Sequence, residues 1–353
     1  MSESNLVFAI PGNLDTPTGG YAYDKKLSEH LPHHGHLVTH LQLGDSFPHP
    51  TAEDTQHAAK HLRAVPGTSV LLIDGLALGA LDPAVLGGVK APIVGLIHHP
   101  LAYEGDLDEV RREELLRREQ VNLARCAEVI VTSPSTATLL SETYGVRRRR
   151  ITIAPPGTQR PILSPAPLDP PLIVSVGSLV PRKGHDVLIR ALAGLTDLPW
   201  QAVVAGLDRD VAYADWLREL MTSHGLDDRL RLVGSVSTTE LNGLYSQASI
   251  FALATRFEGY GMVFDQAMAA GLPIVTCATG AVPDTVAPGA GLLVPVDDHL
   301  AFGEAIRTLL TDDSLRTTMA AASHMAGEAL PTWSHTAQIV ADVLNRTRAG
   351  TIN

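Results

Sequence analysis

The chain has 353 residues, of which 45% are hydrophobic and 18% are charged, and its formal net charge is −11. This length exceeds what one hydrophobic core usually supports, so we expect two domains in a folded, soluble protein. The acidic charge argues against nucleic-acid binding, and no run of about 20 apolar residues is available to cross a membrane. Residues 1–5 lack the basic start of a signal peptide, so we expect a cytoplasmic protein.

The first half of the chain alternates short apolar runs with longer segments of helical period, which is typical of parallel strands joined by helices. A helix is expected at residues 106–125. In such sheets ligands bind at the carboxyl ends of the strands, where His98 and the pair Gly19 and Gly20 are expected to lie. The expected strands are residues 6–10, 37–43, 69–74, 92–98, 128–132 and 151–154.

Seven prolines fall between Pro155 and Pro171 and mark the middle of the chain. Proline at this density continues neither a helix nor a central strand, so this segment predicts a linker between the two domains. The same alternation resumes after it and predicts a second doubly wound sheet. The expected strands there are residues 172–176, 201–205, 230–233, 249–253, 273–275 and 292–294, and the expected helices are 183–195, 210–224, 238–247, 262–270, 312–330 and 334–347.

A carboxylate stands next to a glycine-rich turn in the segment Glu258-Gly259-Tyr260-Gly261, which precedes the helix expected at residues 262–270. Glycines let the backbone approach a ligand closely, and the N–H groups at a helix start favour an anion. A carboxylate repels a bound anion, so Glu258 needs another partner, and sugar hydroxyls donate hydrogen bonds to such a group. The pairing indicates a ligand that carries a phosphate at one end and a sugar at the other.

Residues 248–275, which contain this segment, resemble the nucleotide-sugar motif of family 4 retaining glycosyltransferases, an enzyme family with the GT-B fold. Residues 174–189, V-S-V-G-S-L-V-P-R-K-G-H-D-V-L-I, resemble the strand, loop and helix with which that family holds the donor diphosphate. The resemblance implies an α/β protein with two doubly wound Rossmann-like domains that face a central cleft. It places an acceptor-side domain at residues 1–160, a nucleotide-sugar-binding domain at 161–330, and a helix at 331–353 that crosses back to the first domain.

The resemblance also implies three catalytic residues. Glu258 would hold hydroxyls of the transferred sugar, Lys183 would neutralise the donor diphosphate, and His98 would contact the sugar from the first domain. Lys183 and His98 each have an ordinary alternative, because a lysine at a helix start is often only solvated and a histidine at a strand end is often a satisfied core residue. The other donor-binding residues implied are Gly19, Gly20, Gly177, Ser178, Arg182, Gly234, Val236, Gly259, Tyr260, Gly261, Met262 and Gln266.

Two positions depart from the family pattern. Ser178 stands where the family commonly has an arginine, and Gln266 stands where a second glutamate binds the nucleotide ribose. Asp265 is rotated about 100° around the helix and is not expected to replace that glutamate. Glutamine still bonds a ribose diol but without the charge, at a cost of about 1 kcal/mol. Arg182 is expected to be a second phosphate contact or a surface residue, and Gly19-Gly20 a phosphate-approaching loop or a plain turn.

The activity implied is that of a retaining hexosyltransferase, which moves a sugar from a UDP- or GDP-sugar to a hydroxyl of a saccharide, lipid-linked or small-molecule acceptor. A GT-B epimerase or phosphorylase and a non-catalytic nucleotide-sugar-binding protein remain alternatives. The pairs Asp106/Asp108 and Asp208/Asp210 match a metal-binding Asp-x-Asp pattern, but such pairs are common at helix starts, and we expect no metal and no other cofactor. The run of arginines at 147–150 fits a solvated turn as well as a contact with an anionic membrane surface.

Overall fold

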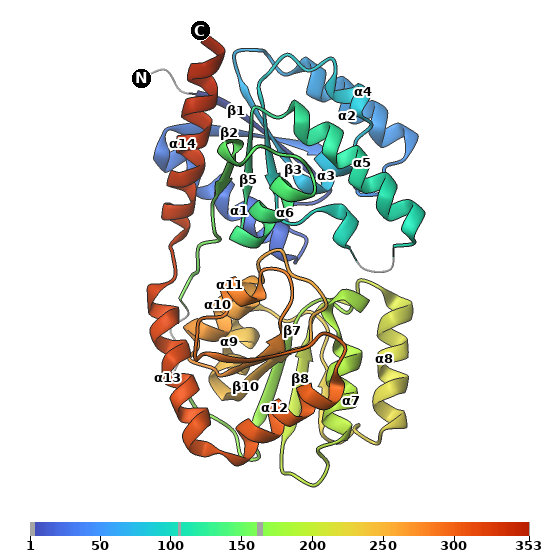
Figure 1. Cartoon of the computed structure of the whole chain (residues 1–353), viewed down its shortest axis with the longest axis vertical. Helices are drawn as coiled ribbons and strands as arrows, with labels where there is room; N and C mark the ends of the chain where they lie inside the picture. Colours follow the sequence, from blue (N-terminus) through green and yellow to red (C-terminus); the bar gives the residue numbers. More distant parts are fainter. Residues whose placement is uncertain (1–3, 105–106, 161–164, 353) are drawn as a thin grey trace. The chain divides into compact units, whose positions relative to one another are not determined.

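The computed structural model describes residues 4–104, 107–160 and 165–352 (Figure 1). Its contacts divide the chain into unit 1, formed by Met1–Gly157 and Pro331–Asn353, and unit 2, formed by Thr158–Leu330. The first division falls three residues before the boundary expected at residue 160, and the last helix groups with unit 1. The described part of the proline-rich linker contains neither helix nor strand, while Pro161 lies outside the described residues.

Unit 1 contains a parallel six-stranded sheet in the order β2-β1-β3-β4-β5-β6. Every strand overlaps its predicted position, and the ends differ by two residues at most. Apart from Asp74 at the end of β3, the central strands β3 and β4 are apolar on both faces, and both are fully buried, as expected of a sheet covered on both sides. The strands are β1 (Ser4–Pro11), β2 (His36–Leu43), β3 (Val70–Asp74), β4 (Ile93–Ile97), β5 (Glu128–Val131) and β6 (Ile151–Ile153).

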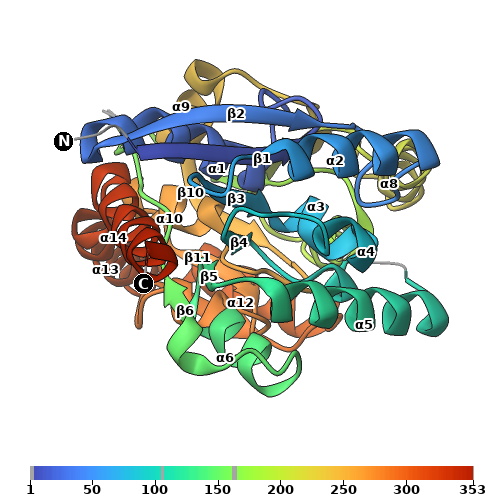
Figure 2. The same cartoon turned by 90° about the horizontal axis from the view of Figure 1, so that it is seen from above.

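Helices cover both faces of this sheet. Figure 2 shows α2, α4 and α5 on one side of the strands and α14 on the other, where it contacts α1. The unit 1 helices are α1 (Gly19–His30), α2 (Ala52–Ala64), α3 (Gly75–Ala80), α4 (Pro83–Leu86), α5 (Glu109–Arg125), α6 (Pro134–Glu142) and α14 (Trp333–Ile352), with short 3-10 turns η1 (Leu31–His34), η2 (Leu101–Tyr103) and η3 (Arg148–Arg150). Helix α5 begins at Glu109 and not at residue 106, because Asp108 caps its first turn by accepting from the Arg111 N–H.

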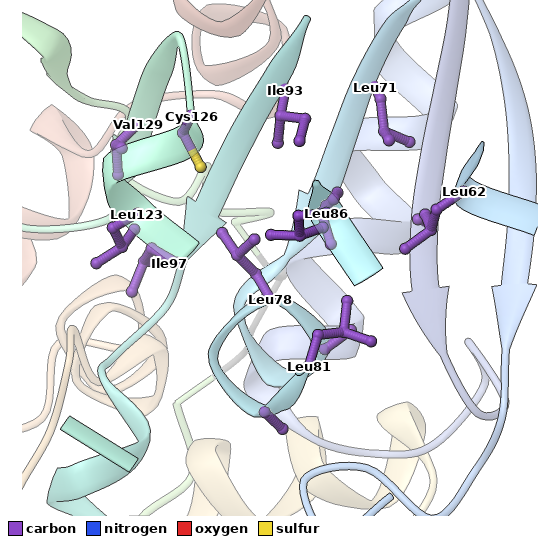
Figure 3. Packing of buried hydrophobic residues seen from close by; sticks show 14 of the residues in the cluster. Leu62, Leu71, Leu78, Leu81, Leu86, Ile93, Ile97, Leu123, Cys126 and Val129 are labelled. Atoms are coloured by element: carbon purple, nitrogen blue, oxygen red, sulfur yellow. The ribbon is translucent and has the colours of Figure 1, made fainter. Parts of the chain in front are cut away.

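One apolar cluster fills the space between the sheet and α2–α5. Figure 3 shows Leu71 and Ile93 of the strands with Leu62, Leu78 and Leu123 of the helices, all of them buried. Full burial of a side chain of this kind contributes about 1.5–3 kcal/mol, so this cluster holds the strand ends in fixed positions.

Unit 2 repeats the plan with a parallel sheet in the order β12-β11-β10-β7-β8-β9. Its strands also lie within two residues of their predicted ends. They are β7 (Leu172–Val176), β8 (Gln201–Ala205), β9 (Leu230–Leu232), β10 (Ala248–Leu253), β11 (Ile274–Cys277) and β12 (Gly291–Val294). The helices are α7 (His185–Ala193), α8 (Val211–Ser223), α9 (Thr238–Gln247), α10 (Met262–Ala269), α11 (Val282–Thr285), α12 (His299–Thr311) and α13 (Asp313–Ala329), with a 3-10 turn η4 (Pro181–Lys183).

Each sheet has a point at which the strand order reverses. In unit 1 the chain leaves β1 for β2 on one side and returns as β3 on the other, and in unit 2 the same reversal separates β8 and β10 around β7. Ligands of open α/β sheets bind at such points, beyond the carboxyl ends of the strands. Within the described residues, no helix combines the length and apolarity needed to cross a membrane.

Candidate functional site

The reversal point of unit 2 brings together two loops that are far apart in the sequence. One follows β7 and contains Arg182 and Lys183, and the other follows β10 and contains Glu258. The Lys183 Nζ atom lies 2.6 Å from Glu258 Oε1, and an Arg182 nitrogen lies 3.6 Å from Glu258 Oε2. The structure therefore places three of the residues selected from the sequence in one ion-pair cluster.

The loop after β7 differs in one respect from the prediction. Lys183 was expected to open the helix, but it lies in the turn η4, and α7 begins two residues later at His185. The break occurs at Gly184, which has a φ of 64° and serves as the N-cap. A side chain at Gly184 would meet the carbonyl oxygen of Ala254 at 1.9 Å, so this glycine lets the Lys183 loop pack against the end of β10.

The loop after β10 ends at Gly261, the left-handed N-cap of α10 with a φ of 93°. A Cβ atom there would lie 2.6 Å from the Phe264 ring, which fixes glycine at this position. Gly259 and Tyr260 lie between Glu258 and this cap, and Met262 begins the helix. The first N–H groups of α10 lack partners within the helix, so this end of it favours an anion.

Glu258 is almost fully buried, and its carboxylate already has protein partners. Besides Lys183, the Thr255 hydroxyl donates a hydrogen bond of 3.0 Å to Oε1. Burial alone would raise the pKa of Glu258, but the charges of Lys183 and Arg182 outweigh it and lower the pKa. Two cations and one carboxylate leave one net positive charge in this cluster (2 − 1 = +1), which suits an anionic ligand group.

Arg182 is not a free surface residue, because one of its nitrogens donates a 2.8 Å hydrogen bond to the Phe257 carbonyl. His185 supports the same loop: its Nε2 lies 3.1 Å from the Gly177 carbonyl, and burial lowers its pKa to about 4. The loop also contains Ser178, directly after Gly177. Sequence reasoning did not select His185 or Thr255, although both stand next to selected motifs.

Gln266 and Asp265 of α10 point to different partners. The Tyr245 hydroxyl donates a 3.1 Å hydrogen bond to Gln266 Oε1, and Gln266 itself is half-buried. Asp265 is buried and accepts from the hydroxyls of Tyr260 at 2.9 Å and Thr158 at 3.3 Å. The predicted rotation of Asp265 away from Gln266 is thus confirmed. Tyr245 was not selected from the sequence.

Two further predicted residues lie beyond β9. The Gly234 carbonyl accepts from the Gly206 N–H at 2.8 Å, and Val236 is half-buried between this point and α9. Asp208 and Asp210 behave as a helix start would: Asp208 pairs with Arg218, and Asp210 caps α8. Of the other Asp-x-Asp pair, Asp106 lies outside the described residues.

In unit 1, His98 lies directly after β4, as predicted. Gly19 and Gly20 do not form a loop but the first turn of α1. A Cβ atom at Gly20 would lie 3.2 Å from the His98 ring, so the missing side chain allows the helix to approach this histidine. His98 Nε2 lies 3.0 Å from Asp24 Oδ1 and 3.4 Å from Asp74 Oδ2.

Neither Asp24 nor Asp74 was selected from the sequence. Asp74 is the last residue of a predicted strand, and the rule that placed His98 at a strand end applies to it equally. The donor atoms of Asp24, Asp74 and His98 lie within 4.8 Å of one another. Among the described residues they are the one set of three such groups close enough to share a metal ion.

Comparisons with known proteins identify similar glycosyltransferases. A family model for glycosyl transferases group 1 matches residues 162–324. The D-inositol 3-phosphate glycosyltransferase of Kineococcus radiotolerans is 28% identical over 272 residues, which cover 69% of this chain and 62% of the relative. The chain thus spans less than two thirds of that relative's length.

Two solved structures share the fold along almost the whole chain. Sucrose-phosphate synthase from Thermosynechococcus elongatus is 21% identical with a TM-score of 0.83, and the match covers 98% of this chain and 100% of that one. Anabaena HepE in complex with UDP-glucose is 18% identical with a TM-score of 0.77, covering 97% and 99%. The chain therefore has the GT-B fold, with two Rossmann-like α/β units, and its residues 162–324 match the group 1 glycosyl transferases.

Proposed function

We propose that the protein is a retaining glycosyltransferase that moves a hexose from a nucleotide-sugar donor, a UDP- or GDP-sugar, to a hydroxyl acceptor. The observation that carries the proposal is the convergence of Lys183, Arg182 and Glu258 at the reversal point of unit 2. Cations for a diphosphate and a carboxylate for sugar hydroxyls stand there within one cluster. The UDP-glucose bound to the structural neighbour HepE supports a donor of this class.

In this mechanism the protein acts through position and charge. Lys183, Arg182 and the N–H groups at the start of α10 would stabilise the departing diphosphate, whose own oxygen takes the acceptor proton. Glu258 would hold hydroxyls of the transferred sugar, while Gln266 would hold the ribose. Unit 1 is proposed to supply the acceptor side, and His98 to contact the sugar.

The test begins with the donor. A thermal-shift screen of the full chain against UDP, GDP, ADP and their sugars should raise the melting temperature with one base, since ligand at a hundred times its Kd stabilises by about 2.7 kcal/mol. Lys183→Ala should remove most of this shift. The matched control is Lys60→Ala, an exposed lysine on α2 of unit 1.

The second step measures transfer with the donor so identified. Release of nucleoside diphosphate that depends on an added hydroxyl acceptor, with an α-linked product from an α-linked donor by NMR, would support the proposal. Conversion of the donor without an acceptor would indicate an epimerase, and turnover with phosphate and no nucleotide would indicate a phosphorylase. Binding without turnover across saccharide, lipid-linked and small-molecule acceptors would indicate a non-catalytic nucleotide-sugar-binding protein.

A further inference from the structure

Two buried carboxylates stand behind the histidine at the reversal point of unit 1. Asp24 comes from the second turn of α1 and Asp74 from the end of β3, and both are at most 4% exposed. His98 comes from the end of β4, and its Nε2 faces both carboxylates, at 3.0 Å and 3.4 Å. The three side chains come from three different elements but share one ring nitrogen as their meeting point.

The carboxyl groups of Asp24 and Asp74 are hydrogen-bonded to each other, which requires a proton on one of them. Asp74 is the group that holds it, since burial and the neighbouring Asp24 charge raise the pKa of Asp74 to about 7. Its other oxygen accepts the Leu76 N–H at 2.9 Å, a cap that a protonated carboxyl can still provide. The Asp24 charge that raises this pKa also faces His98.

His98 responds to this arrangement. Burial alone would lower the pKa of His98, but the charge and hydrogen bond of Asp24, together with Asp74, raise it above its ordinary value. Two other titratable groups face the cluster. Tyr23 of α1 packs its ring edge 5.1 Å from the His98 ring and stays neutral because burial raises its pKa, and burial lowers the pKa of His40 on β2.

We propose that Asp24 and Asp74 are positioning residues that hold His98 as an imidazolium, in a charge-neutral cluster of one cation, one carboxylate and one carboxylic acid. The Nε2–H group of His98 donates to the carboxyl groups of Asp24 and Asp74. As an imidazolium, His98 carries a second N–H at Nδ1, on the other side of the ring from Asp24. His98 therefore presents a hydrogen-bond donor to its ligand, and it recognises an oxygen lone pair of the sugar.

This inference rests on the proposed function where it names the sugar as the ligand and where it predicts an effect on kcat/KM. The proton arrangement also predicts a pH dependence. Below about pH 7 the cluster is neutral, and loss of the shared proton above that pH gives it one negative charge. An anionic donor binds less well to a negative cluster, so kcat/KM is expected to fall on the alkaline side.

The test reads the proton directly. The full chain, without donor or acceptor, is labelled with ¹⁵N-histidine, and its ring nitrogens are followed by NMR from pH 5 to 9, with His98→Gln to assign the signal. We expect His98 to titrate above the ordinary imidazole value of 6.5 and Asp24→Asn to lower its proton affinity at least tenfold. An imidazole that is already neutral at pH 6.5 would overturn the proposal, as would a titration that Asp24→Asn leaves unchanged.

Asp74→Asn gives an independent arm, because an amide mimics the protonated carboxyl and keeps the cap. Asp74→Asn should reduce the fall of kcat/KM at alkaline pH, whereas loss of a merely structural residue would change kcat/KM by the same factor at every pH. If Asp24→Asn fails to fold, the wild-type titration and Asp74→Asn still decide. Stoichiometric Zn²⁺ or Mn²⁺ binding by calorimetry that His98→Gln abolishes would also overturn the proposal, because the three groups would then be metal ligands.

The readouts separate the two hypotheses. The NMR titration needs neither donor nor acceptor, so an absence of glycosyl transfer leaves it interpretable. Conversely, active transfer with a neutral His98 would reject the proton cluster and leave the proposed function standing.

Discussion

Lys183 and Glu258, 75 positions apart in the sequence, form an ion pair of 2.6 Å at the reversal point of unit 2. The two side chains therefore neutralise each other before a ligand binds. A diphosphate that binds as proposed would share Lys183 with this carboxylate. Removing one partner of a buried pair leaves the other charge uncompensated, so substitutions here report on both residues.

Glu258→Ala is expected to lower turnover about tenfold to a thousandfold, on the scale of other transition-state contacts. Free nucleoside diphosphate should bind at least as tightly as before, because Lys183 loses its competing carboxylate. Steady-state kinetics and calorimetry with the diphosphate measure the two effects. The control is Glu219→Ala, an exposed residue of α8 in the same unit. Weaker diphosphate binding that parallels the loss of turnover would contradict the assignment of Glu258 to the sugar.

Gln266→Glu should tighten nucleotide binding by up to about tenfold, because it places a charged acceptor opposite the ribose hydroxyls. The Tyr245 hydroxyl that now donates to Gln266 Oε1 is able to donate to a carboxylate as well, so the local geometry is kept. Calorimetry with the nucleoside diphosphate measures the change. Tyr245→Phe in the Gln266→Glu background removes the support and should reduce the gain. No change in affinity with Gln266→Glu would argue that the ribose does not lie at this residue.

The strands could be predicted closely from the sequence, and the site only in part. A buried parallel strand is a short apolar run, and apart from Asp74 β3 and β4 are apolar on both faces, so the local pattern is enough to find them. Lys183 and Glu258 were found because each stands in a recognisable motif. Their ion pair was not predicted, since it depends on β7 and β10 being neighbours in the sheet.

Asp24 and Asp74 show more clearly what could not be predicted about the site from the sequence. Neither stands in a motif, and their meeting with His98 arises only when β1, β3 and β4 take their order in the sheet. The predicted start of α7 at Lys183 was wrong for a local reason: the backbone at Gly184 is left-handed, and the helix begins after it. Propensity places such a boundary within a few residues, whereas the close approach of Ala254 decides it.

Transfer is expected to be independent of divalent metal, because the proposal assigns the diphosphate charge to Lys183, Arg182 and backbone N–H groups. Activity measured after EDTA treatment and desalting should match the untreated enzyme. Loss of turnover with EDTA and its recovery with magnesium or manganese would show that the charge assignment is wrong.

Arg182→Ala should raise the KM for the donor more than it lowers kcat, since Arg182 is proposed to bind the diphosphate.

Glu119→Gln should stabilise unit 1, and increasingly so as the pH rises. Glu119 of α5 is completely buried and accepts the Leu101 N–H at 3.2 Å, and burial raises its pKa to about 8. The pKa in the unfolded chain is the ordinary value of 4.5, so the folded chain binds the extra proton between these values. Folding stability is therefore greatest below pH 4.5 and is lost as the pH rises through 8, by at most about 1.4 kcal/mol per pH unit.

An amide at this position keeps an acceptor for Leu101 and cannot ionise, which removes that loss. The melting temperatures of Glu119→Gln and the wild type should be similar at pH 5 and differ by several degrees at pH 8, since 1 kcal/mol corresponds to about 2–4 °C in a unit of this size. Glu113→Gln, an exposed change on the same helix, should show no such divergence. A constant difference between Glu119→Gln and wild type from pH 5 to 8 would mean that Glu119 does not hold its proton in the folded chain.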